Sequence, residues 1–398
     1  MKILVLSHMY PSTANDVAGI FVHLQVKALM AKGVEARVIS PSPWSPFPVN
    51  RLSPKWRNYS MIPRSSVRDG VHIYYPRYKV FPRALFFASS GWRMYCGIRK
   101  TIESIYREFP FDIIHAHVAL PDGYTGALLA QDFGKPLVVT IHGQDLQQTV
   151  HRGINCKEAL AYVLHNAFKI IVVSEKLSRL TFEYFALDDK VIVISNGVNI
   201  QNTIKEDVKK GKHVNGNNIV LSVSNLVSIK GINFNIYAIK RLKDKYPNLE
   251  YWVVGSGPEE NKLRGLVTRL GLEKRVKFLG RQPHPEVFKY MANCAVFSLP
   301  SWNEAFGVVY VEAMACGKPV IGCYGEGIED FVEHGKNGLL VKPRDVDSLV
   351  EALDFLLSHP EEARLMGERA RKVVTENYTW KKNAEKTIQV YREVLKVK

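Results

Sequence analysis

Short apolar runs alternate with helical patterns twice along this chain, and this alternation constrains the fold more than any other feature. In the first half, the runs lie at residues 3–6, 34–40, 111–117, 137–141, 169–174 and 191–194. In the second half, they lie at residues 219–223, 251–254, 276–279, 295–299, 319–322 and 338–341. Strands of this length separated by helices form parallel βαβ units. We therefore expect an α/β protein with two doubly wound parallel-sheet domains.

The stretch between the two rounds predicts a domain boundary. Residues 198–218 are polar, rich in lysine and poor in apolar side chains, which is typical of a linker. With 398 residues, of which 46% are hydrophobic, the chain is long enough to bury two cores. We expect a first domain at 1–198, a second domain at 199–378, and a final amphipathic helix within 379–398.

The most informative motif lies late in the second round. A buried strand ends near Leu299, a turn follows, and a helix is expected from about residue 306 to residue 316. Glu312 is the only charged residue of that helix, and a buried carboxylate needs a partner. Glu304 lies eight positions earlier, which is roughly 12 Å at a helical rise of about 1.5 Å per residue. This spacing is close to the reach from the sugar to the ribose of a nucleotide diphosphate sugar.

The start of this helix is suited to an anion. The amides of Phe306, Gly307 and Val308 would point out of the helix N-terminus, where a diphosphate is favoured. Gly307 would let the backbone come close to such a ligand. The spacing alone also fits a simpler interpretation, with Glu304 as a helix cap and Glu312 as a half-buried surface residue.

The segment SWNEAFGVVYVEAMACGKPV at residues 301–320 resembles the donor-binding motif of the retaining glycosyltransferases of family four. The resemblance implies the GT-B fold, in which two Rossmann-like domains face a cleft and the last helix crosses back to the first domain. It places the nucleotide sugar on the second domain and the acceptor on the first. Glu304 would contact the sugar and phosphate region, and Glu312 would hold the ribose hydroxyls. The donor-binding residues between them would be Ala305, Phe306, Gly307 and Val308.

The same resemblance assigns cations to the diphosphate. The family has an arginine, four residues and then a lysine after the first strand of the second domain. Here Lys230 fits the pattern, and Asn225 stands where arginine is usual. One fixed positive charge is therefore missing from the expected site. Arg281, which follows the strand at 276–279, is assigned to the donor site and could compensate.

In the first domain, the candidate residues follow strands, because open parallel sheets bind ligands at the carboxyl ends of their strands. Gly19 opens a helix after the first strand and loop, a common place to receive phosphate. His117, His142 and Asp145 follow two later strands. On residue type alone, a plain turn glycine fits equally well, and a lone histidine at such a position is more often structural. The resemblance places His142 at the reaction centre with Lys230 and Glu304, and places His117 and Asp145 on the acceptor side.

The resemblance predicts a retaining glycosyltransferase that moves a sugar from a nucleotide diphosphate sugar, usually a UDP-sugar, to a hydroxyl group. Its mechanism would be front-face, with the leaving phosphate helping to deprotonate the acceptor. We expect no metal and no cofactor, because a DxD-type motif is absent from the expected donor site. The segments SHMYPS, HAHVALPDG and IHGQD are most similar to bacterial enzymes of cell-wall and exopolysaccharide synthesis, teichuronic acid included. Two alternatives stay open: an epimerase-like enzyme of nucleotide sugars, and a non-catalytic GT-B subunit.

The charge of the chain points to an acidic partner. The formal net charge is +16, and residues 51–107 carry twelve Lys and Arg against two acidic residues. Eleven aromatic residues share this segment, and basic and aromatic side chains together suit an anionic membrane surface. A lipid-linked saccharide acceptor would explain such a surface. A solvated basic face over core aromatics is the alternative, and nucleic acid ranks lower because no recognition module is present.

Cysteine usage and hydropathy indicate the compartment. The five cysteines are odd in number and lack CxxC spacing, which suits a reducing compartment and excludes an obvious zinc site. No apolar run approaches the roughly 20 residues that span a bilayer. We expect a cytoplasmic protein that can bind peripherally to the inner face of the cell membrane.

Overall fold

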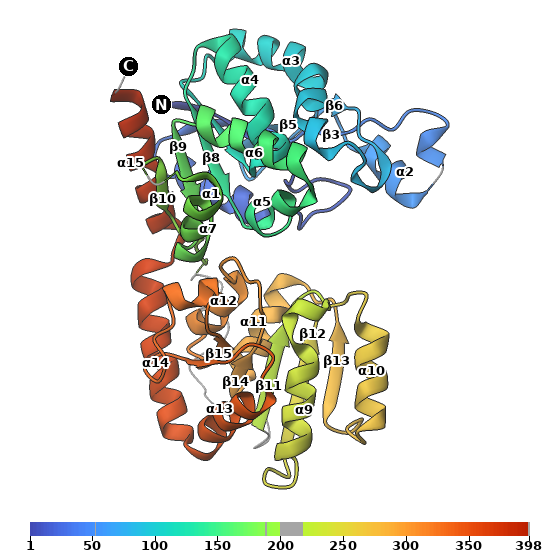
Figure 1. Ribbon diagram of the computed structural model, residues 1–398, viewed down its shortest axis with the longest axis vertical. Coiled ribbons are helices and arrows are strands. Elements are labelled where there is room, and N and C mark those ends of the chain that lie inside the picture. Colours follow the sequence, from blue (N-terminus) through green and yellow to red (C-terminus); the bar gives the residue numbers. More distant parts are fainter. Residues whose placement is uncertain (52, 188, 200–217, 397–398) are drawn as a thin grey trace. The chain divides into compact units, whose positions relative to one another are not determined.

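The computed structural model describes residues 1–51, 53–187, 189–199 and 218–396. These residues form two compact units (Figure 1). Unit 1 contains residues 1–195 and 380–398, and unit 2 contains residues 196–379. The expected boundaries at 198 and 378 lie within a few residues of these limits. Most of the expected linker, residues 200–217, lies outside the described residues.

Unit 1 is built on an eight-stranded sheet with the order β10-β9-β8-β7-β1-β2-β5-β4. Every strand pair is parallel except β4–β5. The strands are β1 (Lys2–Leu6), β2 (Glu35–Ile39), β4 (Ser65–Arg68), β5 (Val71–Tyr74), β7 (Ile113–His117), β8 (Leu137–Ile141), β9 (Lys169–Val172) and β10 (Val191–Val193). The strands β1, β7, β8 and β9 are almost fully buried, as parallel strands covered on both faces should be.

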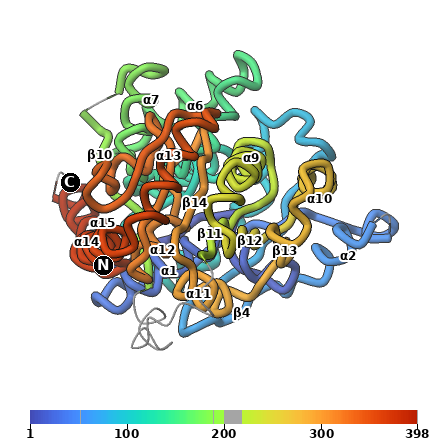
Figure 2. The backbone as a smooth tube through the Cα atoms, turned by 90° about the horizontal axis from the view of Figure 1, so that it is seen from below, coloured from blue at the N-terminus to red at the C-terminus, as the bar shows by residue number. Residues whose placement is uncertain are grey.

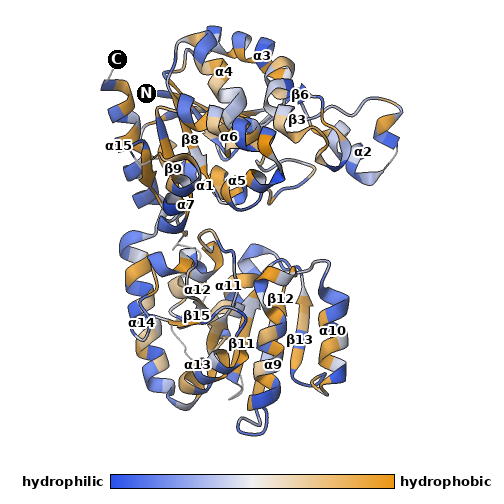
Figure 3. Ribbon diagram, in the orientation of Figure 1, coloured by the Kyte–Doolittle hydropathy of each residue, from blue (hydrophilic) through white to orange (hydrophobic). Residues whose placement is uncertain are grey.

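Helices connect the strands of this sheet, and they begin and end where the sequence provides local signals. They are α1 (Ile20–Met30), α2 (Pro54–Met61), α3 (Ser90–Glu108), α4 (Tyr124–Phe133), α5 (Gln144–Gln147), α6 (Ile154–Asn166) and α7 (Glu175–Phe185). The Ser174 side chain caps α7 by accepting the Leu177 amide, and Gly134 ends α4 in the left-handed conformation. Figure 3 shows the resulting pattern, with hydrophobic strands inside and hydrophilic outer helix faces.

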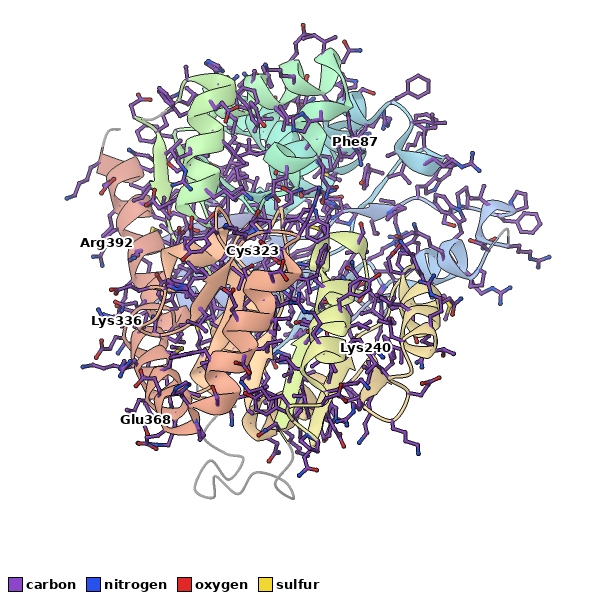
Figure 4. The ribbon with its side chains drawn as sticks, turned by 60° about the horizontal axis from the view of Figure 1, so that its bottom comes forward. Phe87, Lys240, Cys323, Lys336, Glu368 and Arg392 are labelled. Carbon is purple, nitrogen blue, oxygen red and sulfur yellow. The ribbon has the colours of Figure 1, made fainter. Side chains whose placement is uncertain are left out.

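The last helix of the chain, α15 (Trp380–Lys396), belongs to unit 1. It packs against α1, and its Ala384, Ile388, Tyr391 and Val394 join the core formed by β1, β2 and β7. The Tyr391 hydroxyl hydrogen-bonds the His115 ring inside this core, at 2.6 Å. The polar face of α15 carries Arg392, which is labelled in Figure 4.

Unit 2 has a six-stranded parallel sheet with the order β13-β12-β11-β14-β15-β16. Its strands are β11 (Asn218–Val223), β12 (Leu249–Val254), β13 (Val276–Gly280), β14 (Val296–Ser298), β15 (Val320–Cys323) and β16 (Leu339–Val341). Its helices are α9 (Ile232–Leu242), α10 (Glu260–Arg269), α11 (His284–Asn293), α12 (Val308–Ala315), α13 (Val346–Ser358) and α14 (Pro360–Asn377). The expected pair of parallel-sheet α/β domains is therefore confirmed.

The basic segment at 51–107 contains structure that the sequence pattern did not reveal. It supplies α2, the antiparallel pair β4–β5 at the sheet edge, and β6 (Arg77–Tyr78), which pairs with β3 (Ser42–Pro43). These strands are short and rich in arginine, serine and tyrosine, so they lack the apolar runs of the other strands. The Arg77 side chain joins the pieces by hydrogen bonding Ser42 Oγ and the Tyr59 carbonyl, at 2.6 and 2.7 Å.

Candidate functional site

A partly buried ion pair lies at the carboxyl edge of the unit 2 sheet. Lys230 ends the single helical turn Ser228–Lys230 (η7), which follows β11, and its Nζ donates to Glu304 Oε2 at 2.5 Å. The Ser301 hydroxyl donates to the same oxygen at 3.1 Å. Only 21% of the Lys230 side chain and 13% of the Glu304 side chain are exposed. The two residues predicted to contact the sugar and diphosphate are therefore brought together.

Backbone contacts fix the loop that carries Glu304. Asn303 has a φ of 65°, and the Glu304 amide donates to Glu326 Oε2 at 2.5 Å. The Gly327 amide donates to the Glu304 carbonyl at 3.2 Å. A Cβ at Gly327 would lie 2.1 Å from the Ala305 carbonyl oxygen, so only glycine fits this approach. Glu326 and Gly327 are site residues that the sequence reasoning missed.

The helix α12 begins immediately after this loop. Its N-cap is Gly307, with a φ of 86°, and the helix runs from Val308, two residues later than expected. Phe306 is buried, which anchors the loop. The first amides of a helix have no partner within the helix, and the first turn of α12 contains no acidic residue to occupy them. This end of α12 is therefore suited to an anionic group beside Lys230.

Glu312 has the partner that its burial requires. His284, at the start of α11, contacts Glu312 Oε1 through Nε2 at 2.7 Å. The Glu312 side chain is 13% exposed and the His284 side chain is 53% exposed. The hydrogen bond to Glu312 raises the pKa of His284 above its ordinary value. His284 was not among the predicted residues, because it comes from another helix 28 positions away.

Asn225 and Arg281 occupy loops on the same edge and are both exposed. The Arg281 guanidinium donates through Nε to Ser256 Oγ at 2.8 Å. The loop that carries Asn225 lies beside the loop that carries Ser256, because the Leu226 amide donates to the Ser256 carbonyl at 3.1 Å. A Cβ at Gly255 would lie 1.8 Å from the Ser224 carbonyl oxygen, which explains glycine at this position. Arg281 is thus tethered near the strand end that carries Asn225.

At the carboxyl edge of unit 1, Gly19 is required by close packing. It is the N-cap of α1, with a φ of 60°. A Cβ there would lie 1.9 Å from the Met9 carbonyl oxygen. The loop after β1 and the start of α1 therefore touch backbone to backbone, which only glycine permits.

His117 and His142 form a stacked pair beside this loop. His117 Nδ1 lies 3.0 Å from His142 Nε2, and the rings are 5.3 Å apart with an interplanar angle of 12°. Phe21 of α1 packs on His142, with 4.6 Å between ring centroids. Burial lowers the pKa of His142 to about 3 and holds the pKa of His117 well below its ordinary value. Both imidazoles are therefore neutral at physiological pH.

The pair also has unused hydrogen-bonding capacity. His117 Nε2 and His142 Nδ1 are buried, and neither has a hydrogen-bond partner among the described residues. Buried polar atoms of this kind usually find a partner, so a bound group can supply one. This geometry is compatible with the roles predicted for His117 and His142, which stay predictions.

Asp145, in α5, is a backbone anchor. Its carboxylate accepts the amides of Ala119 and Leu120 at 3.0 and 3.3 Å. The residue is 1% exposed, and burial raises its pKa to about 6. Its two oxygens hold the turn Ala119–Gly123 (η4), which follows β7. The predicted acceptor contact of Asp145 stays a prediction, and the observed contact is with this turn.

Family profiles match nearly the whole chain in two adjacent parts. Residues 18–202 match the profile described as Glycosyltransferase Family 4, and residues 203–373 match the one described as Glycosyl transferases group 1. The chain belongs to the group 1 family of glycosyltransferases. The expected family is therefore confirmed, and residues 203–373 contain Lys230, Glu304 and Glu312.

Individual glycosyltransferases of known sequence or structure are also similar to this chain. A putative teichuronic acid biosynthesis glycosyltransferase, TuaC of Bacillus subtilis, is 29% identical over 89% of this chain and 88% of its own. An N-acetyl-alpha-D-glucosaminyl L-malate synthase of Bacillus anthracis is 29% identical over 75% of this chain and 78% of its own. The sucrose-phosphate synthase structure from Thermosynechococcus elongatus aligns over 100% of both chains with a TM-score of 0.81 and 23% identity. Anabaena HepE in complex with UDP aligns over 99% of this chain and 100% of its own, with a TM-score of 0.77 and 21% identity. The fold is GT-B.

This glycosyltransferase has a further pair of residues at the unit 1 edge that the sequence reasoning missed. His8 follows β1, and its amide donates to Asp122 Oδ1 at 2.9 Å. Its ring Nδ1 lies 2.6 Å from Asp122 Oδ2. Asp122 belongs to the turn Ala119–Gly123 and is fully buried. The position of His8 directly after a strand was an available signal, but Asp122 lies 114 positions away.

None of the helices in the described part of the chain is long and apolar enough to cross a bilayer. Within the same residues, no three His, Cys, Asp or Glu side chains are arranged to hold a metal ion.

Proposed function

We propose that this glycosyltransferase transfers a sugar from a UDP-sugar to a saccharide hydroxyl with retention of anomeric configuration. The observation that carries the proposal is the partly buried Lys230–Glu304 pair beside the start of α12. Lys230 and the first amides of α12 supply positive charge for a diphosphate. We propose that the Glu312 carboxylate, in the second turn of the same helix, accepts hydrogen bonds from the ribose hydroxyls.

Each proposed role follows from the chemistry of the groups. Lys230 stabilises the charge that develops on the departing diphosphate, and Glu304 orients Lys230 and the sugar. His142, kept neutral by burial, donates or accepts a hydrogen bond to the sugar without adding charge. We assign the charge compensation to these groups, so the proposed reaction needs no metal. The structures of Anabaena HepE in complex with UDP and with UDP-glucose support uridine as the base.

The test of the donor site is calorimetric titration of UDP, GDP and ADP with EDTA present. We compare the wild type with Glu312→Ala and with Glu368→Ala, a surface glutamate of α14 that is labelled in Figure 4. The expected result is that UDP binds the wild type and Glu368→Ala and binds Glu312→Ala at least 10-fold more weakly. Equal affinity in all three proteins would remove Glu312 from the site. No binding by any nucleotide would favour the non-catalytic alternative.

Retention and metal independence need a separate measurement. The anomeric proton coupling of the product, read by NMR, should match that of the α- or β-linked donor supplied. Turnover should be unchanged by EDTA. An inverted product, or activity that returns only with Mg²⁺ or Mn²⁺, would contradict the corresponding part of the proposal.

We also propose that the acceptor is lipid-linked and that unit 1 docks on an anionic membrane. Large apolar side chains are exposed in two neighbouring segments of unit 1. Trp44 and Phe47 precede α2 and Met61 is its last residue, with Phe47 71% and Met61 70% exposed. Phe81, Leu85, Phe86 and Trp92 precede or begin α3, with Phe86 70% exposed. We name these seven residues the apolar rim.

Cations accompany the apolar rim. Arg51 lies over the Phe47 ring at 5.0 Å, and Arg93 lies over the Phe81 ring at 4.8 Å. Figures 1 and 2 both show α2 and the turn before it extending away from the rest of unit 1. Apolar rings with cations beside them suit the headgroup region of an anionic bilayer, where each nearby cation contributes about 1 kcal/mol.

Sedimentation with vesicles tests the docking. The protein should bind vesicles with 30% phosphatidylglycerol at low salt and should bind pure phosphatidylcholine weakly. The double variant Phe47→Ser/Phe86→Ser should lose most of the binding. Phe182→Ser is the matched control, because Phe182 of α7 is 57% exposed and outside the apolar rim. Vesicle binding that is absent, or unaffected by the double variant, would contradict the docking.

A further inference from the structure

A groove of about 240 Å³ runs along the helices α9 and α10 of unit 2. These two helices lie side by side (Figure 1). The groove is lined by the buried Leu263 and Leu266 of α10 and by Phe234 and Tyr237 of α9. Each pair is spaced by three residues and therefore shares one face of its helix. The groove is smaller than the roughly 300–1,000 Å³ of sites for drug-sized ligands, so it has room for about one sugar-sized ring.

Trp302 adds an indole ring to this lining and is held in place by the protein itself. The Arg344 guanidinium lies over the Trp302 ring at 4.7 Å, and the Phe234 ring contacts it edge to face, with 5.8 Å between centroids. The Trp302 amide donates to the Ile229 carbonyl at 2.9 Å. Arg344 has a φ of 61°, which a residue other than glycine rarely adopts. The aromatic surface is therefore formed before any ligand binds, which lowers the cost of binding.

The groove also has an excess of positive charge. Lys262, Arg269 and Arg344 line it, and Glu259 is the single acidic residue of the lining, so the net charge is +2. Glu259 is paired with Lys262 at 3.0 Å. Among the described residues, neither Arg269 nor Arg344 forms an ion pair. Two guanidinium groups are thus available to an anion, and a guanidinium matches the geometry of a carboxylate or a phosphate.

The combination of aromatic rings and available guanidinium groups suits a small, charged ligand with an apolar face. A pyranose ring has such a face, made of C–H groups, and it can pack on the electron-rich face of an aromatic ring such as that of Tyr237, which is 39% exposed. An acidic group on the sugar would meet the arginines. The groove is too small for a partner protein, because a stable interface needs about 800 Å² of surface from each partner.

We propose that this groove binds one anionic sugar unit, which carries a carboxylate or a phosphate, at a site separate from the nucleotide site. Neither Lys230 nor Glu304 lines the groove. The two sites share loops, however, because Trp302 lies two residues before Glu304 and the lining residue Ser228 lies two residues before Lys230. The sugar unit can be a free sugar phosphate or a uronate within a longer saccharide. The inference does not depend on the proposed transferase function.

Calorimetry on the full-length protein at low salt tests the ligand class. The probes are glucose 6-phosphate, methyl β-D-glucuronide, the neutral methyl β-D-glucoside and inorganic phosphate, each titrated with and without saturating UDP. We expect at least one charged sugar to bind with a Kd of about 1 mM or tighter, and about 10-fold more tightly than the neutral glucoside and inorganic phosphate. A preference for glucose 6-phosphate would identify a free sugar phosphate as the ligand, and a preference for the glucuronide would identify a uronate.

Three results of this titration would overturn the proposal. If neither charged sugar binds, the groove is not a sugar site. If the neutral glucoside or inorganic phosphate binds as tightly as the charged sugars, the rings and the arginines do not act together. If UDP abolishes the binding of the charged sugars, they occupy the nucleotide site.

Variants locate the bound sugar. Tyr237→Ala and the double variant Arg269→Gln/Arg344→Gln should each weaken binding of the charged sugar about 10-fold, because they remove the aromatic wall and the cations. Phe355→Ala is the control for Tyr237, since Phe355 of α13 is also 39% exposed and lies outside the groove. Arg264→Gln is the control for the arginines, since Arg264 lies on α10 but is paired with Glu260 at 2.8 Å.

The controls should bind the charged sugar as the wild type does, and thermal unfolding should show that all the variants are folded. Unchanged affinity in both groove variants, or an equal loss in their controls, would overturn the proposal. The result is independent of the transferase test. A protein that binds a charged sugar but no nucleotide would retain the groove site and refute the proposed function, and the reverse result would refute only the groove site.

Discussion

The candidate residues at the carboxyl edges of the two sheets differ in charge. In unit 2, the candidate residues are charged and paired, as Lys230 with Glu304 and His284 with Glu312. In unit 1, His117 and His142 are kept neutral by burial, backbone contacts at Gly19 shape the site, and the His8–Asp122 pair carries no net charge. The two edges have similar topology, since each follows parallel strands, but only one is prepared for an anion.

This difference explains how each of the two sites can be stable without a bound ligand. A cation meant for a diphosphate would be costly if it were buried alone, and Glu304 lowers that cost in the empty site. A site meant for hydroxyl groups needs no net charge, because neutral imidazoles can donate and accept hydrogen bonds. Each of the following predictions challenges or refines this comparison.

The largest effect is expected from Lys230→Met. Loss of the cation should lower the rate of UDP release about 100- to 1,000-fold, because the developing charge on the diphosphate loses its principal partner. Lys336→Met, an exposed lysine labelled in Figure 4, is the control. Because Lys230→Met also leaves Glu304 unpaired, the double variant Lys230→Met/Glu304→Gln should recover stability but no activity. Activity within 10-fold of the wild type would show that unit 2 does not rely on this charge.

Gly19→Ala should strongly destabilise unit 1. The new Cβ would meet the Met9 carbonyl oxygen at 1.9 Å, and the residue has a φ of 60°. We expect a loss of about 3 kcal/mol in the free energy of unfolding, measured by urea denaturation. Gly33→Ala is matched in its positive φ of 86° but has open space around it, and it should cost about 1 kcal/mol. Equal losses of unfolding free energy in the two variants would mean that the contact between Gly19 and Met9 does not determine the structure of the unit 1 edge.

His142→Asn should lower turnover about 10- to 30-fold and leave UDP affinity unchanged, because it removes one neutral hydrogen-bonding ring from unit 1. The pKa of His142 is lowered to about 3, so the ratio of wild-type to variant activity should be constant from pH 5.5 to pH 8. His165→Asn, an exposed histidine of α6, is the control. A ratio that changes with pH in this range would show that His142 titrates and that unit 1 is not neutral.

The smallest effect concerns His284. Its pKa is raised by the bond to Glu312, so protonation stabilises the folded state. That stability is fully present below about pH 6.5 and is lost as pH rises through the raised pKa. We expect His284→Gln to be less stable than the wild type at pH 5.5 by under about 1 kcal/mol, since the ring is half exposed. The difference should vanish at pH 8.5 and should be absent in the Glu312→Gln background. A difference that grows with pH would contradict the pairing.

The strands and the family could be predicted from sequence because they depend on local patterns. The apolar run at 137–141 became β8 without any change in its limits, and the glycosyltransferase motif contains Glu304 in the loop before α12 and Glu312 within α12. The antiparallel pair β4–β5 was missed, because its alternating polar and apolar residues lie at a sheet edge and are too few to form an apolar run.

The partners of the predicted residues could not be read from sequence, because folding brings them together from distant positions. Lys230 and Glu304 were both named, but their contact spans 74 positions. His284, Glu326 and His8 carry no motif, and each is recognised only by the group it contacts. The exposed rings of the apolar rim were also only partly anticipated. Trp44 and Phe47 precede the segment at 51–107, and Met61 is not among its eleven aromatic residues, of which Tyr75 and Tyr78 are buried.

The placement of α15 affects the order in which this protein can fold during synthesis. Unit 1 starts at the N-terminus, yet its core includes Tyr391 and Val394, which leave the ribosome after the whole of unit 2. The core of unit 1 therefore lacks α15 while unit 2 leaves the ribosome and folds. The domain translated first is completed last. A nascent chain arrested when residue 379 has just left the ribosomal exit tunnel should accordingly contain a protease-resistant unit 2 and a protease-sensitive unit 1.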